Sequence, residues 1–284
     1  MKNKICLITG GNAGIGKATA VGLAKQGAQV VIVSRSEEKA QQAVKDIIAQ
    51  SNNQQVDYLI ADLASQQSIR QLAAEFKSKY SQLHVLVNNA GAFFSEYGLT
   101  EDGIERQWAV NHLAPFLLTN LLLDVLKASA PARIVNVSSR AHYRGKIDFE
   151  DLNGTKNYDG FFKAYSQSKL ANVLFTAELD RRLKGTGVTA NSLHPGVVST
   201  EIAQKNSSGW AYWGWTFLRP FMVSTEQGAA TSVFLASSPK VEGVSGKYFE
   251  KSKEKKPGKL AQDAALAKRL WEVSAQLTKL ETAL

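Results

Sequence analysis

The sequence predicts an α/β fold in which helices cover both faces of a single doubly wound parallel sheet. Short runs rich in Val, Ile and Leu alternate along the chain with longer segments whose apolar residues recur at helical spacing. The 284 residues contain no internal repeat, no low-complexity linker and no abrupt change of composition. One domain over residues 1–284 is therefore the expected organisation.

Each expected element is bounded by a change in residue type. Strands are short runs that are apolar almost throughout, as in parallel sheets covered on both faces. Helices are longer and amphipathic, and the first ends at Gly27, a residue typical of a helix C-terminus. The expected strands are 4–9, 29–34, 56–60, 84–88, 133–138, 188–193 and a short one near Tyr248; the expected helices are 15–26, 37–50, 66–80, 105–127, 161–183, 225–236 and a C-terminal one after a lysine-rich connection, both within 251–284.

The composition is that of an ordinary globular protein, with 44% hydrophobic and 21% charged residues. The best candidate for a membrane span, residues 113–126, is interrupted by Thr119, Asn120 and Asp124. The first residues lead directly into a strand, without the apolar core of a secretory signal. Cys6 is the only cysteine, which excludes an intrachain disulfide and fits a reducing compartment. We therefore expect a cytoplasmic protein.

The charge distribution does not favour a nucleic-acid binder. The formal net charge is +9, and six lysines with two glutamates lie between Lys247 and Lys259. No stacking aromatics alternate with these lysines, so we expect a solvated connection and no nucleic-acid partner. The four histidines are scattered without ligand spacing, and no metal site is expected.

A glycine-rich segment lies between the first strand and the first helix. Gly10, Gly14 and Gly16 follow Thr9 in the pattern G-x-x-x-G-x-G, not the better-known G-x-G-x-x-G. Because glycines have no Cβ atom, they allow a tight turn and the close approach of a phosphate. The N-terminus of the following helix attracts such an anion. The segment, with Asn12 and Ile15, therefore predicts a dinucleotide site in a Rossmann-type sheet. Glycines with a conformational role alone are the alternative.

The residue after the second strand bears on which dinucleotide binds. An acidic side chain there, about 20 residues beyond the glycines, would bind the ribose hydroxyls of NAD. The sequence has Arg35 instead, and no carboxylate before Glu37. A guanidinium suits a 2′-phosphate, so we expect NADP(H), with NAD less favoured. An ordinary solvated arginine is the alternative.

Tyr165 and Lys169 are four residues apart in the segment 161–183, which contains neither Pro nor Gly. On a helix this spacing places the phenol and the ammonium on one face. A nearby positive charge favours the phenolate, so we expect Lys169 to lower the pKa of Tyr165 toward the neutral range. An isolated pair of this kind is usually incidental, and the surrounding motifs decide its meaning.

Several motifs in the same order make the sequence resemble the short-chain dehydrogenase/reductase family. Longer stretches, such as Ser168-Lys169-Leu170-Ala171-Asn172, resemble its retinol dehydrogenase branch, including relatives that bear WW domains. A lengthened segment between Arg140 and Ala164 is also typical of that branch. The matching motifs are Thr9-Gly10-x-x-x-Gly14-x-Gly16, Asp62-Leu63, Asn88-Asn89-Ala90-Gly91, Asn111, Ser138-Ser139, Tyr165-x-x-x-Lys169 and Pro195-Gly196.

The resemblance implies roles for the matching residues. Ser139 would hold the substrate oxygen, and it is preferred over Ser138 because strand alternation places it at the open strand end. Tyr165 would transfer the proton, Lys169 would hold the nicotinamide ribose, and Asn111 would hold a water. The other cofactor-binding residues would be Asp62 and Leu63 at the adenine, Asn88, Ala90 and Gly91 after the fourth strand, and Pro195, Gly196, Val197, Val198 and Thr200 near the nicotinamide. His112, His142 and His194 are expected to be structural.

These expectations together predict an NADP(H)-dependent enzyme that interconverts a carbonyl and an alcohol by hydride transfer. The segment 204–223 contains six aromatic residues and would cover the substrate cleft, which favours an apolar, retinoid-like substrate. The sequence leaves open whether this segment is a lid, core or a peripheral membrane contact. A dinucleotide-binding regulatory protein without turnover is the alternative function. Relatives often form homodimers through the helix after Asn111, which Pro115 would kink, so a homodimer is also left open.

Overall fold

The computed structural model describes residues 1–94, 96–156, 158, 163–196 and 224–280. The expectations for the aromatic segment 204–223, and for Val197, Val198 and Thr200, lie outside the described residues.

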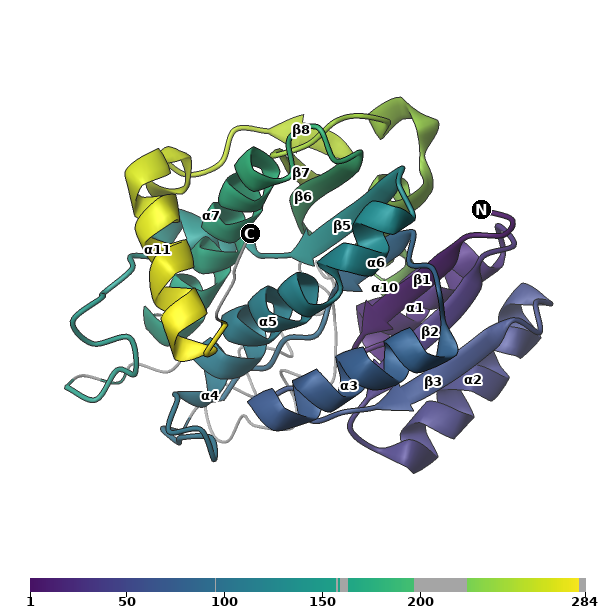
Figure 1. Cartoon of the computed structure of the whole chain (residues 1–284), viewed down its shortest axis with the longest axis horizontal. Helices are drawn as coiled ribbons and strands as arrows, with labels where there is room; N and C mark the ends of the chain where they lie inside the picture. Colours follow the sequence, from purple (N-terminus) through teal and green to yellow (C-terminus); the bar gives the residue numbers. More distant parts are fainter. Residues whose placement is uncertain (95, 157, 159–162, 197–223, 281–284) are drawn as a thin grey trace.

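One eight-stranded sheet contains the described strands in the order β3-β2-β1-β4-β5-β6-β7-β8 (Figure 1). Neighbouring strands are parallel except β8, which is antiparallel to β7. The order reverses between β1 and β4, and such a switch point leaves a crevice at the carboxyl ends of the strands. The predicted fold class is confirmed. The strands are β1 (Ile5–Thr9), β2 (Gln29–Ser34), β3 (Val56–Ile60), β4 (Val85–Asn88), β5 (Ala132–Val137), β6 (Val188–His194), β7 (Tyr248–Glu250) and β8 (Lys253–Lys255).

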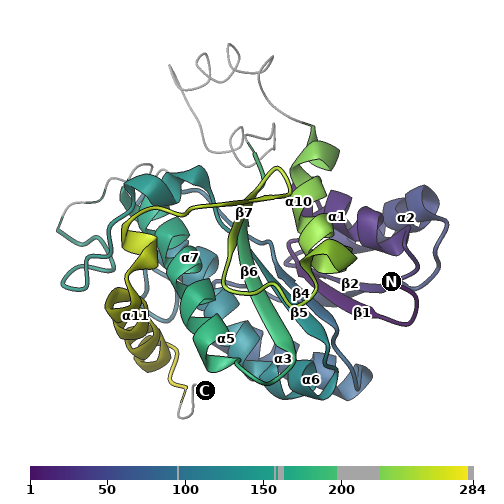
Figure 2. The same ribbon diagram turned by 90° about the horizontal axis from the view of Figure 1, so that it is seen from above.

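Helices cover both faces of the sheet (Figure 2). One layer holds α1, α2 and α10, and the other holds α3, α5, α6 and α7, with α11 packed outside α7. Serine side chains cap the N-termini of α2, α3 and α10, which explains why these helices begin where the sequence predicts. The helices are α1 (Gly14–Ala24), α2 (Glu37–Ser51), α3 (Gln66–Lys79), α4 (Arg106–Trp108), α5 (Ala114–Leu121), α6 (Leu123–Ala128), α7 (Tyr165–Arg182), α10 (Thr225–Ser237) and α11 (Ala264–Leu277).

The prediction of one continuous helix over 105–127 is wrong. The chain forms α4, a π-helical turn at Ala109–Leu113, then α5 and α6. Pro115 lies in the first turn of α5 and has no N–H to donate to the carbonyl of Asn111, four residues earlier. The wider turn therefore replaces regular helix at the residue that the family resemblance singles out.

The helix α7 is buried over most of its length, because the sheet covers one side and α11 covers another. Trp271 of α11 packs edge-on against Phe116 of α5, with ring centroids 4.9 Å apart. It also lies 5.7 Å from the ring of Phe175 in α7. These contacts hold α7, and with it Tyr165 and Lys169, in a rigid position.

The lysine-rich connection contains a strand that the sequence does not predict. Residues Lys253–Lys255 form β8 at the edge of the sheet, and their side chains are exposed. Lysines are typical of such edges, because their charge opposes pairing with another chain. Within the part of the chain described here, no helix is both long and apolar enough to cross a membrane.

Candidate active site

The loop between β1 and α1 is shaped by its glycines. Gly10 and Gly14 have positive φ values of 64° and 52°, which side chains with a Cβ rarely adopt. A Cβ on Gly16 would lie 2.2 Å from the carbonyl oxygen of Gly10. Ala13 precedes α1 and offers no side-chain acceptor, so the first N–H groups of the helix point to a place where an anion would be favoured. Asn12 in this loop and Ile15 in the first turn of α1 are half-buried.

Thr9 joins the glycine loop to the turn after β4. Its Oγ1 accepts hydrogen bonds from the backbone N–H groups of Asn89 and Ala90, both at 3.0 Å. The Nδ2 of Asn89 donates to the Thr9 carbonyl at 2.8 Å. Thr9 is itself buried. Its side chain therefore holds together the two loops that the sequence assigns to the cofactor.

Asn88 lies one residue before that turn, and its side chain points into the protein. Its Nδ2 donates to Thr119 at 2.9 Å and to Asn136 at 2.8 Å. With only 4% of its surface exposed, Asn88 presents backbone and no side chain to the crevice. Ala90 and Gly91 remain half-buried beside it. A Cβ on Gly91 would lie 3.2 Å from the Nζ of Lys169.

Tyr165 and Lys169 lie one turn apart on α7, as their spacing predicts. The Nζ of Lys169 lies 5.5 Å from the centre of the Tyr165 ring and donates to the Val137 carbonyl at 3.3 Å. The Ser139 side chain lies close enough to the Tyr165 phenol to lower its pKa. The neighbouring Ser138 points elsewhere, since its hydroxyl donates to the Lys169 carbonyl at 2.7 Å. The structure thus brings together Ser139, Tyr165 and Lys169.

The electrostatics of this cluster differ from the expectation. Burial raises the pKa of Tyr165, and the neighbouring Ser139 side chain opposes this rise. Burial also lowers the pKa of Lys169 to about 8. The prediction that Lys169 lowers the pKa of Tyr165 below its ordinary value is therefore wrong for this structure, because burial has the larger effect on the pKa.

Asn111 lies in the π-helical turn, fully buried. Its Oδ1 accepts from the Ala92 N–H at 2.7 Å, and its Nδ2 donates to the Ala92 carbonyl at 2.9 Å. A longer bond of 3.2 Å joins Nδ2 to the hydroxyl of Ser168. The side chain therefore ties the loop after β4 to α7, and its predicted role in holding a water stays a prediction.

Arg35 and Asp62 are placed at the far end of the same crevice. Arg35 follows β2 directly and is exposed, without a hydrogen bond or ion pair to any other described residue. Asp62 follows β3 and is also exposed, although its Oδ1 accepts from the Ala64 N–H at 2.9 Å. Since both follow parallel neighbouring strands, they lie at the carboxyl edge of the sheet together with the glycine loop.

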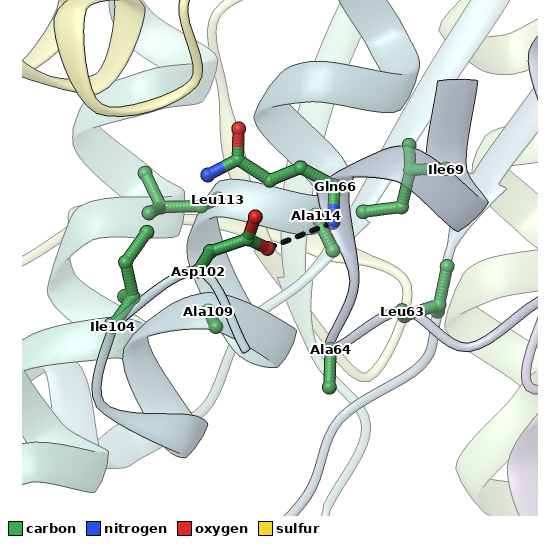
Figure 3. A pocket seen from close by; sticks show the side chains of 9 residues that line it. All are labelled: Leu63, Ala64, Gln66, Ile69, Asp102, Ile104, Ala109, Leu113 and Ala114. Atoms are coloured by element: carbon green, nitrogen blue, oxygen red, sulfur yellow. Dashed lines mark hydrogen bonds between the residues drawn. The ribbon is translucent and has the colours of Figure 1, made fainter. Parts of the chain in front are cut away.

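Leu63 points away from this edge into a small apolar pocket of about 10 Å³ (Figure 3). The pocket is closed by Ile69 of α3 and Leu113 of the π-helical turn, and the Asp102 carboxylate accepts from the backbone N–H of Gln66 at 3.0 Å across its mouth. The pocket has room for about one water molecule, so it is a packing defect and no ligand site.

Four further residues belong to this part of the structure. Pro195 and Gly196 follow β6 at the same edge of the sheet, and Gly196 has a φ of 97°. Phe93 packs edge-on against the ring of Tyr165, with centroids 6.1 Å apart. Sequence reasoning missed Asn172, whose Nδ2 donates to the Asn111 carbonyl at 2.8 Å. Its position, three residues after Lys169 on a largely apolar helix, is the signal that would have found it.

Comparisons with known proteins identify the family of this chain. Residues 4–210 match the family model for short chain dehydrogenases. Human retinol dehydrogenase 13 is 47% identical over 282 residues, which cover 98% of this chain and 85% of that protein. Mouse retinol dehydrogenase 12 is 48% identical, with 96% and 86% of the two chains covered.

Solved structures show the same similarity. An uncharacterised protein from Mycobacterium paratuberculosis superposes with a TM-score of 0.80 at 34% identity, covering 100% of this chain and 96% of that one. The NADP complex of RhlG from Pseudomonas aeruginosa has a TM-score of 0.71 at 25% identity, with 88% and 94% covered. With these matches along nearly its whole length, the chain belongs to the retinol dehydrogenase branch of the short-chain dehydrogenase/reductase family of oxidoreductases.

Proposed function

We propose that this protein is an NADP(H)-dependent oxidoreductase that interconverts the carbonyl and alcohol forms of an apolar substrate. The observation that carries the proposal is the grouping of the Ser139 hydroxyl and the Tyr165 phenol, whose pKa Ser139 lowers, with the Lys169 ammonium on the next turn. The two hydroxyl groups can both meet one substrate oxygen. That oxygen is the atom whose charge changes most during carbonyl reduction.

Three residues of the chain have separate roles in the reaction at this oxygen. A bound nicotinamide cofactor supplies or accepts the hydride at the carbonyl carbon. Tyr165 donates its proton to the oxygen in reduction and takes it back in oxidation. Ser139 stabilises the negative charge that develops on the oxygen. Lys169, charged below pH 8 or so, favours the phenolate form that Tyr165 takes after donating.

The crevice fits a dinucleotide on three grounds. The backbone of the glycine loop is packed so closely that a Cβ atom would not fit, as at Gly16. The N-terminus of α1 offers N–H groups to a pyrophosphate. Arg35, exposed and without a partner among the described residues, offers a guanidinium to a 2′-phosphate. Complexes of two structural neighbours, RhlG and a gluconate 5-dehydrogenase, contain NADP.

The apolar substrate is supported by what surrounds the phenol. The Phe93 ring packs edge-on against the Tyr165 ring, with centroids 6.1 Å apart, so an apolar side chain adjoins the tyrosine. Retinol dehydrogenases 12 and 13, to which the chain is similar, carry in their name a large apolar alcohol as substrate. We therefore expect turnover to rise with the apolar surface of the aldehyde or ketone, since burying such surface contributes about 25 cal/mol per Å².

The test is an NADPH-oxidation screen over aldehydes and ketones graded by size and apolarity, with Tyr165→Phe measured on the best substrate. Removal of the proton donor should lower kcat by about 10²-fold or more while NADPH still binds. Tyr80→Phe is the matched control, because Tyr80, which follows α3, donates to Asp57 of β3 and lies outside the site. A folded Tyr165→Phe protein with undiminished turnover would overturn the mechanism.

A further inference from the structure

The imidazole of His142 connects Ser139 to a distant part of the chain. His142 lies in the 3-10 helix η2 (Arg140–Arg144), which directly follows Ser139. Its Nδ1 lies 2.7 Å from the Ser139 carbonyl oxygen. Its Nε2 lies 3.1 Å from the backbone nitrogen of Gly258, which is 116 residues further along the chain.

The partners define which ring nitrogen carries the proton. The Gly258 N–H can only donate, so Nε2 of His142 must be the unprotonated acceptor. The proton then sits on Nδ1 and is donated to the Ser139 carbonyl. Each ring nitrogen is matched to its partner in the neutral imidazole, and burial lowers the pKa of His142, which keeps the ring in that form.

The ring has little freedom to move. Only 1% of the His142 surface is exposed. The ring lies 4.0 Å from the ring of Tyr143 and 4.6 Å from that of Tyr248, a β7 residue. Neighbours of His142 attach to the same C-terminal region, since Arg140 pairs with Glu250 and the Tyr143 hydroxyl donates to the Lys256 carbonyl at 2.9 Å. The imidazole is thus a rigid link between Ser139 and the connection after β8.

We propose that His142 is a positioning residue: by linking the Ser139 carbonyl to the Gly258 N–H, it fixes the Ser139 backbone and so sets the Ser139 hydroxyl against Tyr165. The proposal rests on the proposed function, in which Ser139 stabilises the substrate oxygen. Ser139 is the last residue before η2 and has an extended backbone, with φ −157° and ψ 159°. A rotation of its peptide plane would carry the hydroxyl away from the phenol, and misplacement by about 1 Å can cost 10²-fold in rate.

Two substitutions separate the two bonds of the ring. In His142→Asn the side-chain amide can still donate to Ser139 but does not reach Gly258. In His142→Gln the longer side chain can accept from Gly258, and the bond to Ser139 is lost. We expect kcat to fall about tenfold in each variant, because the link between Ser139 and Gly258 needs both of its bonds. KM for NADPH should not change, because His142 does not face the crevice.

Tyr143→Phe is the matched control. It removes the neighbouring bond to Lys256 in the same connection and leaves the bonds of His142 intact. If the connection matters only for general stability, Tyr143→Phe and His142→Gln will lower kcat and the melting temperature alike, which would overturn the proposal. If His142 acts through Ser139, Tyr143→Phe will leave kcat unchanged. Rates are referred to the folded fraction measured by near-UV circular dichroism.

A double-mutant cycle with Ser139→Ala completes the test. Ser139→Ala alone should lower kcat about 10²-fold, and His142→Gln should add no further loss in that background, because the hydroxyl it positions is gone. A tenfold loss in both backgrounds would refute the positioning role. A large loss in Ser139→Ala with full activity in His142→Gln would refute the role of His142 and leave the proposed function standing. Full activity in Ser139→Ala would refute the role of Ser139 itself.

Discussion

The side-chain amide of Asn172 donates a hydrogen bond of 2.8 Å to the backbone carbonyl of Asn111. In a regular helix that carbonyl would accept from the N–H four residues later, but the later residue is Pro115. Asn172, one turn after Lys169 on α7, supplies the missing donor. The Oδ1 of Asn172 in turn lies 3.4 Å from Nδ1 of His112, whose Nε2 lies 2.9 Å from Ser274 on α11. A buried polar chain therefore ties α11 to the turn that holds Asn111.

Asn172→Ala should destabilise the protein and impair turnover together. The substitution leaves the Asn111 carbonyl buried without its donor, which costs about 1–3 kcal/mol in the free energy of unfolding. Because the Asn111 side chain holds the loop after β4 at Ala92, we expect kcat to fall as well. Denaturant unfolding and NADPH oxidation measure the two effects.

The matched control is Asn120→Ala on α5. The Nδ2 of Asn120 donates to the Phe116 carbonyl at 2.9 Å, which lies inside a helix and keeps its helical donor. The loss should therefore be less than about 1 kcal/mol, with kcat unchanged. Equal effects of the two substitutions would show that the Asn111 carbonyl, which Pro115 leaves without a helical donor, does not depend on the bond from Asn172.

Lys169 should reduce the stability of the folded protein at neutral pH. Burial lowers its pKa from 10.5 to about 8, so between these values the unfolded chain binds more protons than the folded one. The contribution of Lys169 to the free energy of unfolding is therefore lowest below pH 8 and rises as the pH rises toward 10.5. The difference is roughly 3 kcal/mol, at about 1.4 kcal/mol per unit of pKa.

Lys169→Met should accordingly be more stable than the native chain at pH 7, by less than roughly 3 kcal/mol because the bond to Val137 is lost. The gain should vanish near pH 10.5, and turnover should be lost at every pH. Denaturant unfolding between pH 7 and 10.5 measures this. Lys163→Met removes an exposed lysine two residues before Tyr165 and should give no such gain. A Lys169→Met protein without a pH-dependent gain would contradict the lowered pKa.

Arg35→Asp should change the cofactor preference from NADPH to NADH. A guanidinium bonded to a phosphate contributes about 1.5–3 kcal/mol, so the Kd for NADPH should rise by about tenfold to a hundredfold. The Kd for NADH should change little or fall. Lys45→Asp makes the same charge change on an exposed residue of α2 and controls for general electrostatics. If both cofactors weaken equally, or if Lys45→Asp has the same effect, Arg35 does not read the 2′-phosphate.

Local patterns predicted the elements and the residues that sit within them. The glycine loop, Arg35 after its strand and the pair Tyr165 and Lys169 on one helical turn all follow from spacing within a single element or a single connection. The apolar runs likewise predicted most strand ends to within one residue of their positions in the structure. These features depend on backbone geometry that neighbouring residues determine.

Contacts between distant parts of the chain could not be predicted in this way. His142 meets Gly258 across 116 residues, and Asn172 meets Asn111 across 61. Pro115 indicated a disturbed helix, but not that a π-helical turn would result or which side chain would take up the free carbonyl. The pKa of Tyr165 was predicted in the wrong direction for a related reason, since spacing shows the charge of Lys169 but not the burial of the phenol.

The protein should not form a dimer through the face of α5 and α7, the arrangement that the family resemblance leaves open for the helix after Asn111. That face is covered by α11 of the same chain. Trp271 is 3% exposed, packs against Phe116 and Phe175, and has the Arg182 guanidinium 4.4 Å above its ring. A partner would have to displace these contacts, and removing such a buried tryptophan costs about 3–5 kcal/mol.

Light scattering over a range of protein concentrations, with chemical cross-linking to map any contact, measures this prediction. We expect no cross-links between copies on α5 or α7 in the native chain. Trp271→Ala should lower the free energy of unfolding by about 3–5 kcal/mol and uncover Phe116 and Phe175, so that self-association through this face increases. Lys268→Ala, an exposed change on the same helix, should alter neither property by more than about 0.5 kcal/mol. A native dimer cross-linked through α5 or α7 would show that α11 moves aside, which its buried Trp271 opposes.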